Sequence, residues 1–232
     1  MSAVPSIPNI IAMTASSHPL IRPFIAEFLG TMALAAVAAS ASVGVSLFPQ
    51  FTYLFVPFLV GLAVMVLVAV LGPVSGAHFN PAVSLGLWVA GRLAPVRLVL
   101  DVAAQLIGAS LGVDLAKQLI GSSPAIGAGI GSTVFLGEAC GAFLLVGTVA
   151  AAAMGKIEKS VAPLYIGAAL TCGVTLALAS SGGILNPAIA LALGAHHLGY
   201  ILGPLVGGLV AAPFVLWLLT ADRHEGNGSQ KT

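Results

Sequence analysis

The chain has 232 residues, of which 59% are hydrophobic and only 6% are charged. A typical soluble domain carries about 25% charged residues, and eight basic and seven acidic residues cannot cover a core of this size with a water-facing surface. The composition therefore excludes a water-soluble enzyme. It also excludes a nucleic-acid-binding protein, because that class needs a concentrated basic face. We expect a protein of the lipid bilayer.

Six stretches are long and apolar enough to cross a bilayer, since a spanning helix needs about 20 mostly apolar residues. They lie at about 24–45, 53–71, 96–118, 133–153, 161–180 and 198–219. Two more apolar segments, at about 80–90 and 186–194, are too short to span. Each follows a span whose end is marked by a break, Gly72-Pro73 or Ser180-Ser181-Gly182-Gly183. Irregular backbone at membrane depth is tolerated only where protein buries it or a wet cavity solvates it, so the two half-helices imply a pore.

The basic residues predict the orientation of the chain, because they gather on the cytoplasmic side of a membrane. With both termini in the cytoplasm, only Lys117 lies outside. Seven basic residues then lie inside: Arg22, Arg92, Arg97, Lys156, Lys159, Arg223 and Lys231. We therefore expect a multi-pass protein of the cell membrane, with flexible cytoplasmic tails over residues 1–22 and 221–232. The N-terminal tail is a poor signal peptide, because no basic residue precedes its short apolar run.

The chain also repeats itself, which places its functional site. A shift of 106 residues brings Asn80-Pro81-Ala82 onto Asn186-Pro187-Ala188 and Ser75-Gly76 onto Ser181-Gly182. With three spans in each repeat, at about 23–118 and 132–220, the second copy enters from the opposite face. An inverted repeat of this kind places its site near the midplane, at the repeat interface. The sequence thus predicts an all-α membrane protein with one channel domain over residues 23–220.

Each Asn-Pro-Ala triplet predicts the start of a half-helix. Proline is favoured at the first helical position, and asparagine is favoured as the N-cap. Inversion brings the two caps together, so both half-helices aim their positive N-terminal ends at the pore centre. A cation or a proton meets that field and loses hydration, whereas a neutral solute needs only hydrogen bonds. We expect the amides of Asn80 and Asn186 to face the lumen.

At this point the chain resembles the major intrinsic protein family, which contains the aquaporins and aquaglyceroporins. The matching runs are AEFLGT at 26–31, SGAHFNPAVS at 75–84, AQLIGA at 104–109, LNPA at 185–188 and GPLVGG at 203–208. The resemblance covers residues 22–220 and implies a passive channel with an hourglass pore in each subunit, assembled as a homotetramer. It implies no catalysis, no cofactor and no metal.

The resemblance also implies roles for the re-entrant loops and for two acids. Backbone carbonyls should line one pore wall, in an extended conformation that glycine makes cheap, at Gly76, Ala77, His78, Phe79, Gly182, Gly183, Ile184 and Leu185. Glu27 and Glu138 should accept hydrogen bonds from the loop backbone; direct solute contact is the alternative. We expect no other acid at the midplane, which argues against a proton-coupled transporter.

The histidines allow two interpretations each. His78 is either a packed residue of the vestibule or a gate that responds to protonation. His196 and His197 follow the second half-helix and should lie near the outer mouth. Two adjacent histidines without a third ligand are only weak evidence for a metal site.

The four positions of the family's selectivity filter depart from its pattern. They fall on Val60, Val174, Gly183 and Ile189, where Ile189 replaces an arginine that follows the second Asn-Pro-Ala. Small apolar residues widen the constriction, and loss of the guanidinium removes a fixed charge and its directed donors. We expect passage of neutral solutes such as glycerol, urea or arsenious acid, and also of water. The departure resembles that of bacterial channels associated with arsenic resistance.

Three other functions stay open at this point. One is an ordinary water channel with a relaxed filter. Another is an adhesive or junction-forming protein, although the short and nearly uncharged external loops offer little binding surface. The third is a secondary transporter, which ion-coupled counterflow would reveal.

Overall fold

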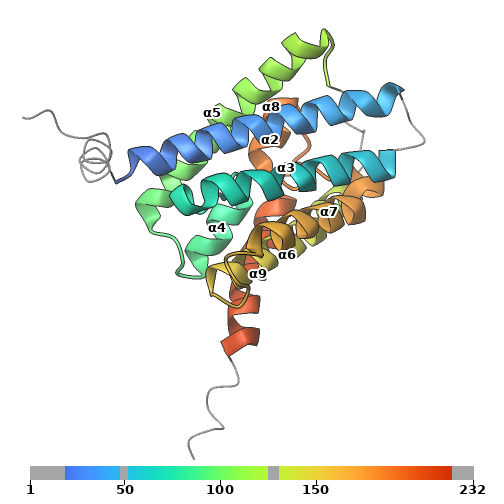
Figure 1. Ribbon diagram of the computed structural model, residues 1–232. Coiled ribbons are helices and arrows are strands. Elements are labelled where there is room, and N and C mark those ends of the chain that lie inside the picture. Colours follow the sequence, from blue (N-terminus) through green and yellow to red (C-terminus); the bar gives the residue numbers. More distant parts are fainter. Residues whose placement is uncertain (1–18, 48–51, 125–130, 221–232) are drawn as a thin grey trace, which may run out of the picture.

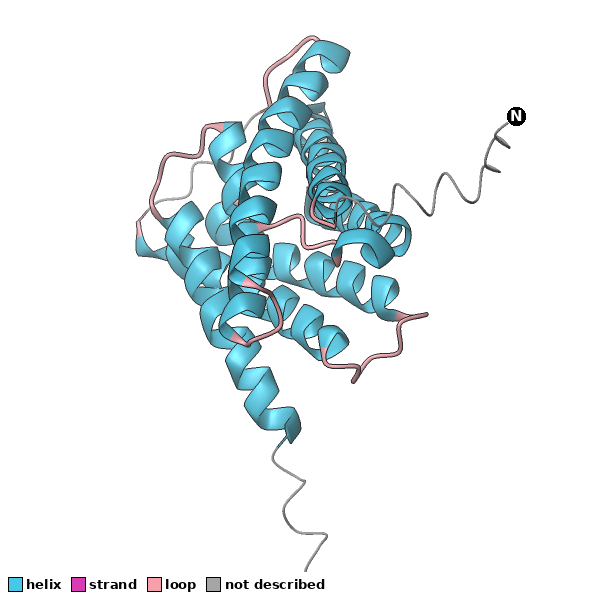
Figure 2. Cartoon of the chain, turned by 90° about the vertical axis from the view of Figure 1, so that its left-hand side faces the viewer, coloured by secondary structure: helices cyan, strands magenta, loops and turns pink. Residues whose placement is uncertain are grey.

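A computed structural model describes residues 19–47, 52–124 and 131–220, and this part of the chain is helical throughout, with short connections (Figures 1 and 2). The helices are α2 (Ile21–Leu47), α3 (Thr52–Ser75), α4 (Pro81–Val89), α5 (Pro95–Ile120), α6 (Ser132–Ala153), α7 (Ala162–Ser181), α8 (Pro187–Leu193) and α9 (Gly199–Thr220). Most of the two predicted tails, residues 1–18 and 221–232, lies outside the described residues.

Six of these helices, α2, α3, α5, α6, α7 and α9, are long and apolar enough to cross a membrane. They confirm the six predicted spans, and α4 and α8 coincide with the two predicted half-helices. Two boundaries differ from the prediction. α2 begins at Ile21, inside the segment assigned to the tail, and α3 continues through Gly72-Pro73 to Ser75. A proline removes only one hydrogen bond of the helix ladder, and the helix ends where Gly76 turns into the left-handed region at φ 96°.

The two halves of the chain pack by the same rules. α2 packs on α5 in the first half as α6 packs on α9 in the second, and α3 crosses α7 between the halves. Glycines allow the close approach: a Cβ on Gly112 would lie 2.1 Å from the Met32 carbonyl oxygen, and one on Gly207 would lie 2.3 Å from the Ala139 carbonyl oxygen. No side chain fits at such distances, so the backbones themselves are in contact.

The half-helices exchange partners between the repeats. α4 belongs to the first repeat and packs mainly on α9, whereas α8 belongs to the second and packs mainly on α5. A Cβ on Gly86 of α4 would meet the Gly208 carbonyl oxygen of α9 at 2.7 Å. This exchange joins the repeats into one unit and brings the start of α4 against the start of α8.

Large apolar side chains cover the outer faces of the long helices. Examples are Leu119, Val70 and Leu54, which are 75%, 66% and 65% exposed. Such exposure would be costly in water. A bilayer tolerates such apolar outer faces, which accounts for the small number of charges in the sequence.

Candidate pore

The two half-helices begin beside each other, and each starting asparagine binds both its own helix and the opposite loop. Asn80 Oδ1 accepts from the Ala82 amide at 2.8 Å, and Asn80 Nδ2 donates to the Leu185 carbonyl at 2.8 Å. Asn186 Oδ1 accepts from the Ala188 amide at 3.0 Å, and Asn186 Nδ2 donates to the Phe79 carbonyl at 2.8 Å. The reciprocal bonds fix the distance and the orientation of the two helix N-termini.

This geometry defines what each asparagine can offer to a solute. An amide nitrogen carries two hydrogens, and one of them on each side is committed to the opposite loop. The second hydrogen stays available, and both asparagines line the central cavity. The two positive helix ends therefore meet at a point where the cavity has two fixed donors.

The sequence analysis predicted extended re-entrant loops, but the structure shows a different conformation. They enter the left-handed region repeatedly, at Gly76, Ala77 and Phe79 in the first loop and at Gly182, Gly183 and Leu185 in the second. For a residue other than glycine this conformation costs about 1–2 kcal/mol. The first loop holds two such residues, so other contacts must offset the strain.

Glu27 and Glu138 supply those contacts. Glu27 is fully buried and accepts four hydrogen bonds, from the Ser75 hydroxyl at 2.7 Å, the His78 and Phe79 amides at 2.9 and 2.7 Å, and Gln105 Nε2 at 2.9 Å. Glu138, also fully buried, accepts from the Ser181 hydroxyl at 2.6 Å and from the Ile184 and Leu185 amides. Each carboxylate thus binds consecutive amides of one loop, which is the supporting role expected of it.

A second contact sits one turn farther along each of these helices. Phe79 and Leu185, the residues just before the asparagines, are fully buried. A Cβ on Gly30 would lie 2.0 Å from Phe79 Cε1, and one on Gly141 would lie 2.4 Å from Leu185 Cδ2. Glu27 and Gly30 share one helix face at a spacing of three residues, as do Glu138 and Gly141. In each repeat, one helix face therefore accepts hydrogen bonds from the loop amides through its glutamate and packs against the buried loop side chain, Phe79 or Leu185, at its glycine.

A cavity of about 110 Å³ lies between the repeats. All four predicted filter residues line it: Val60 from α3, Val174 from α7, Gly183 from the second loop and Ile189 from α8. Ala77, His78, Phe79, Gly182 and Ile184 line it as well, together with the two asparagines. Gly76 and Leu185 do not. The Leu185 carbonyl instead accepts from Asn80, and Gly76 continues the hydrogen-bond pattern of α3 through its amide.

The filter residues are held tightly and present apolar surface. Gly183 packs against Val174, since a Cβ on this glycine would lie 2.6 Å from the Val174 carbonyl oxygen. Aliphatic side chains of α2, α3, α6 and α7 complete the wall opposite the loops. The polar side chains of the lining are therefore few: Asn80, Asn186 and His78 on the loop side, and Ser42 of α2.

Asp101 is a buried acid that the sequence interpretation missed. It lies on α5 with no exposed side-chain surface, and its Oδ2 lies 3.1 Å from His78 Nδ1. Arg97, one turn earlier, donates to Asp101 Oδ1 at 3.1 Å and to the Ser75 carbonyl at 2.9 Å. The Arg-x-x-x-Asp spacing was a usable signal, because residues four apart on a helix are neighbours. The sequence interpretation considered Glu27 and Glu138 alone, and Asp101 adds a third buried acid, beside the first loop.

Among the described residues, Glu27, His78 and Asp101 could offer three metal-ligand atoms within 4.8 Å of one another. Both carboxylates are already engaged, Glu27 by four donors and Asp101 by Arg97 and His78. The cluster is therefore a hydrogen-bonded network that supports the loop.

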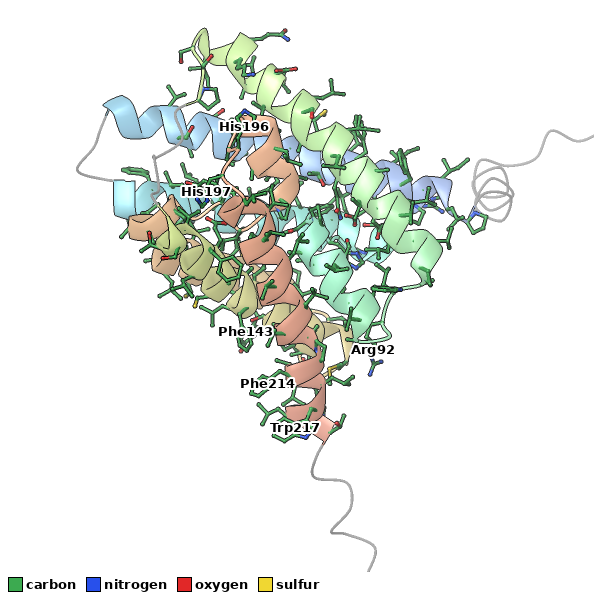
Figure 3. The ribbon with its side chains drawn as sticks, turned by 180° about the vertical axis from the view of Figure 1, so that it is seen from behind. Arg92, Phe143, His196, His197, Phe214 and Trp217 are labelled. Atoms are coloured by element: carbon green, nitrogen blue, oxygen red, sulfur yellow. The ribbon has the colours of Figure 1, made fainter. Side chains whose placement is uncertain are left out.

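His196 and His197 lie at the far end of the molecule from Arg92 and Trp217 (Figure 3). His197 Nδ1 accepts from the Gly199 amide at 3.0 Å, at the start of α9.

Comparisons with known proteins identify the family of this chain. A family model described as Major intrinsic protein matches residues 14–215. Aquaglyceroporin AqpS of Rhizobium meliloti (strain 1021) is 32% identical over 220 residues, covering 88% of this chain and 93% of its own. Aquaporin TIP2-1 of Arabidopsis thaliana is 33% identical over 211 residues, covering 82% of this chain and 84% of its own.

The fold has a counterpart among solved structures. The X-ray structure of the aquaglyceroporin from Plasmodium falciparum superposes with a TM-score of 0.65 and 24% identity, over 85% of this chain and 95% of that one. The match extends over nearly the whole of both chains. This chain belongs to the major intrinsic protein family, whose members are membrane channels for water and small solutes rather than enzymes.

Proposed function

We propose that this protein is a passive channel for small uncharged solutes larger than water, with a selectivity filter that contains no arginine. One observation carries the proposal: Val60, Val174, Gly183 and Ile189 line the same cavity as the two asparagines. None of the four side chains is charged or polar. The filter therefore selects by width and apolar character, and the donors and acceptors for the solute come from the loops.

The physical argument favours polyhydroxylated neutral solutes. An arginine at position 189 would add a fixed charge and up to five directed donors to the constriction. Isoleucine adds neither. A larger solute therefore meets no fixed charge at the constriction and has more room to pass. Glycerol, urea and metalloid hydroxides such as arsenious acid combine suitable size with hydrogen-bonding groups. The name of the relative AqpS, an aquaglyceroporin, supports this class of solute.

In this proposal Asn80 and Asn186 orient the solute and, with the half-helix ends, form the barrier to cations. The carbonyls of the two loops accept hydrogen bonds from the solute as it passes. We further propose that the channel is a homotetramer in the cell membrane with both termini in the cytoplasm. The distribution of basic residues supports that orientation.

The alternative is an ordinary water channel with a relaxed filter, which the similarity to the aquaporin TIP2-1 favours. Stopped-flow light scattering on proteoliposomes separates the two functions. Water, glycerol and arsenious acid are compared in one preparation, with protein-free liposomes as the control. Rapid passage of the larger solutes supports the proposal. Rapid passage of water alone would mean that the loop backbone sets the cut-off, and the water channel would replace it.

A further inference from the structure

The central cavity has one titratable side chain in its described lining, that of His78. Its other polar side chains are Asn80, Asn186 and Ser42, which do not change charge with pH. Since Ile189 stands where the family pattern has arginine, any charge on the pore wall must come from His78 or from the groups behind it.

Those groups come from three helices. Glu27 of α2 accepts from the backbone amide of His78, and Asp101 and Arg97 of α5 lie behind its ring. Ser84 of α4 lies 3.3 Å from His78 Nδ1. Both oxygens of Glu27 accept hydrogen bonds from N–H donors, which are the His78 and Phe79 amides and Gln105 Nε2.

The charges of this cluster do not balance when His78 is neutral. Two carboxylates, Glu27 and Asp101, face one guanidinium, Arg97, which leaves one negative charge in excess beside the pore wall. Such an excess attracts a cation into the pore, in opposition to the half-helix ends. A proton on His78 cancels the excess. The positive charge on the His78 ring then lies beside a carboxylate, because Asp101 Oδ2 is 3.1 Å from His78 Nδ1.

We propose that His78, positioned by the Arg97–Asp101 pair, determines the charge selectivity of this pore. When His78 is protonated, the wall carries no net charge and the two half-helix ends exclude cations. When it is neutral, the excess negative charge weakens that exclusion. Uncharged solutes feel no such difference. The inference rests on the proposed function, because it requires that solutes pass through this cavity.

The second loop has no histidine at the equivalent position, which Ile184 occupies. Its Ser181 carbonyl, equivalent to the Ser75 carbonyl that Arg97 holds, accepts from the Tyr200 hydroxyl at 2.7 Å. A phenol stays neutral through the range in which histidine titrates. The Ser181 carbonyl is therefore held by a neutral group where the Ser75 carbonyl is held by a guanidinium.

The test measures potassium leak and glycerol flux on the same proteoliposomes. Both sides of the membrane have equal pH, so the orientation of the protein does not matter, and protein-free liposomes supply the background. Between about pH 8 and about pH 5.5, which spans the histidine range, we expect the wild-type potassium leak to fall on the order of tenfold. The glycerol flux should change little.

Three variants identify the group responsible. In His78→Gln the acid-induced fall in leak should disappear. The double variant Arg97→Gln/Asp101→Asn keeps the excess charge of the cluster unchanged. It removes the carboxylate that holds the His78 ring, so the acid-induced fall in potassium leak should shrink several-fold. His196→Gln removes an exposed histidine at the far end of the molecule (Figure 3) and should keep the wild-type fall.

The outcomes separate this inference from the proposed function. Glycerol flux with a pH-independent potassium leak would overturn the role of His78 and leave the channel function intact. An acid-induced fall that persists in His78→Gln would do the same. Absence of flux for every solute would refute the proposed function, and this inference with it.

Discussion

At the scale of single residues, Ile189 is the position at which we expect a substitution to change selectivity most directly. Ile189→Arg should place a long donor-bearing side chain across the cavity lined by Val60 and Val174. We expect the ratio of glycerol to water permeability to fall about tenfold or more, since one misplaced polar group costs on the order of 1–3 kcal/mol. Stopped-flow measurement of both fluxes in one preparation gives the ratio independently of protein amount, and Ile189→Leu serves as the size-matched comparison. Equal loss of both fluxes would contradict the filter assignment.

The buried acids act on stability at the same scale. In Glu27→Gln one oxygen becomes an amide nitrogen, which cannot accept from the donors now facing it. We expect a loss of about 2–3 kcal/mol, and a smaller loss for Glu138→Gln, because Glu138 binds fewer donors. Thermal unfolding in detergent measures both. Glu158→Gln, at an exposed position, should unfold like the wild type. An unchanged melting temperature in Glu27→Gln would show that the first loop does not depend on this carboxylate.

At the scale of the elements, each re-entrant loop packs on a spanning helix at a glycine, the first loop at Gly30 of α2 and the second at Gly141 of α6. Gly30→Ala forces a Cβ to within 2.0 Å of the Phe79 ring and should destabilise the fold by about 1–3 kcal/mol. Gly72→Ala is the matched control, because its Cβ would meet its nearest neighbour at an ordinary 3.7 Å. Alanine is the better helix former, so the control should be as stable as the wild type or slightly more stable. Melting temperatures of the two variants in one detergent decide the point.

The elements were also what the sequence predicted best. Length and hydropathy located six spans, and the Asn-Pro pairs located both half-helix starts at Pro81 and Pro187. The loop conformation could not be read in the same way, because Ala77 and Phe79 adopt left-handed backbone that the Glu27 hydrogen bonds and the packing of Phe79 on Gly30 stabilise. Such support links residues about 50 positions apart, which no local pattern reveals.

At the scale of the whole molecule, the inverted repeat explains both the success and the failure of the sequence interpretation. Symmetry related the two Asn-Pro-Ala triplets and the two glutamates, and the structure places these groups in matching environments. Asp101 has no acidic counterpart in the second repeat, so a search guided by symmetry passed over it. The Ser75 carbonyl of the first loop is thus held by the Arg97 guanidinium, whereas the Ser181 carbonyl of the second is held by the Tyr200 hydroxyl.

The orientation of the molecule in the membrane is a prediction of the same scale. Ser122 follows α5 and Ser160 precedes α7, and the single span α6 separates them, so they must lie on opposite sides. Ser160 lies beside Lys156 and Lys159, which the distribution of charge places in the cytoplasm. In a background with Cys140 and Cys172 replaced by alanine, Ser122→Cys should react with a membrane-impermeant maleimide on intact cells. Ser160→Cys should react only after permeabilisation. The reverse pattern would invert the topology, and it would place the His78 cluster on the outer half of the pore, where external rather than cytoplasmic protons would set its charge.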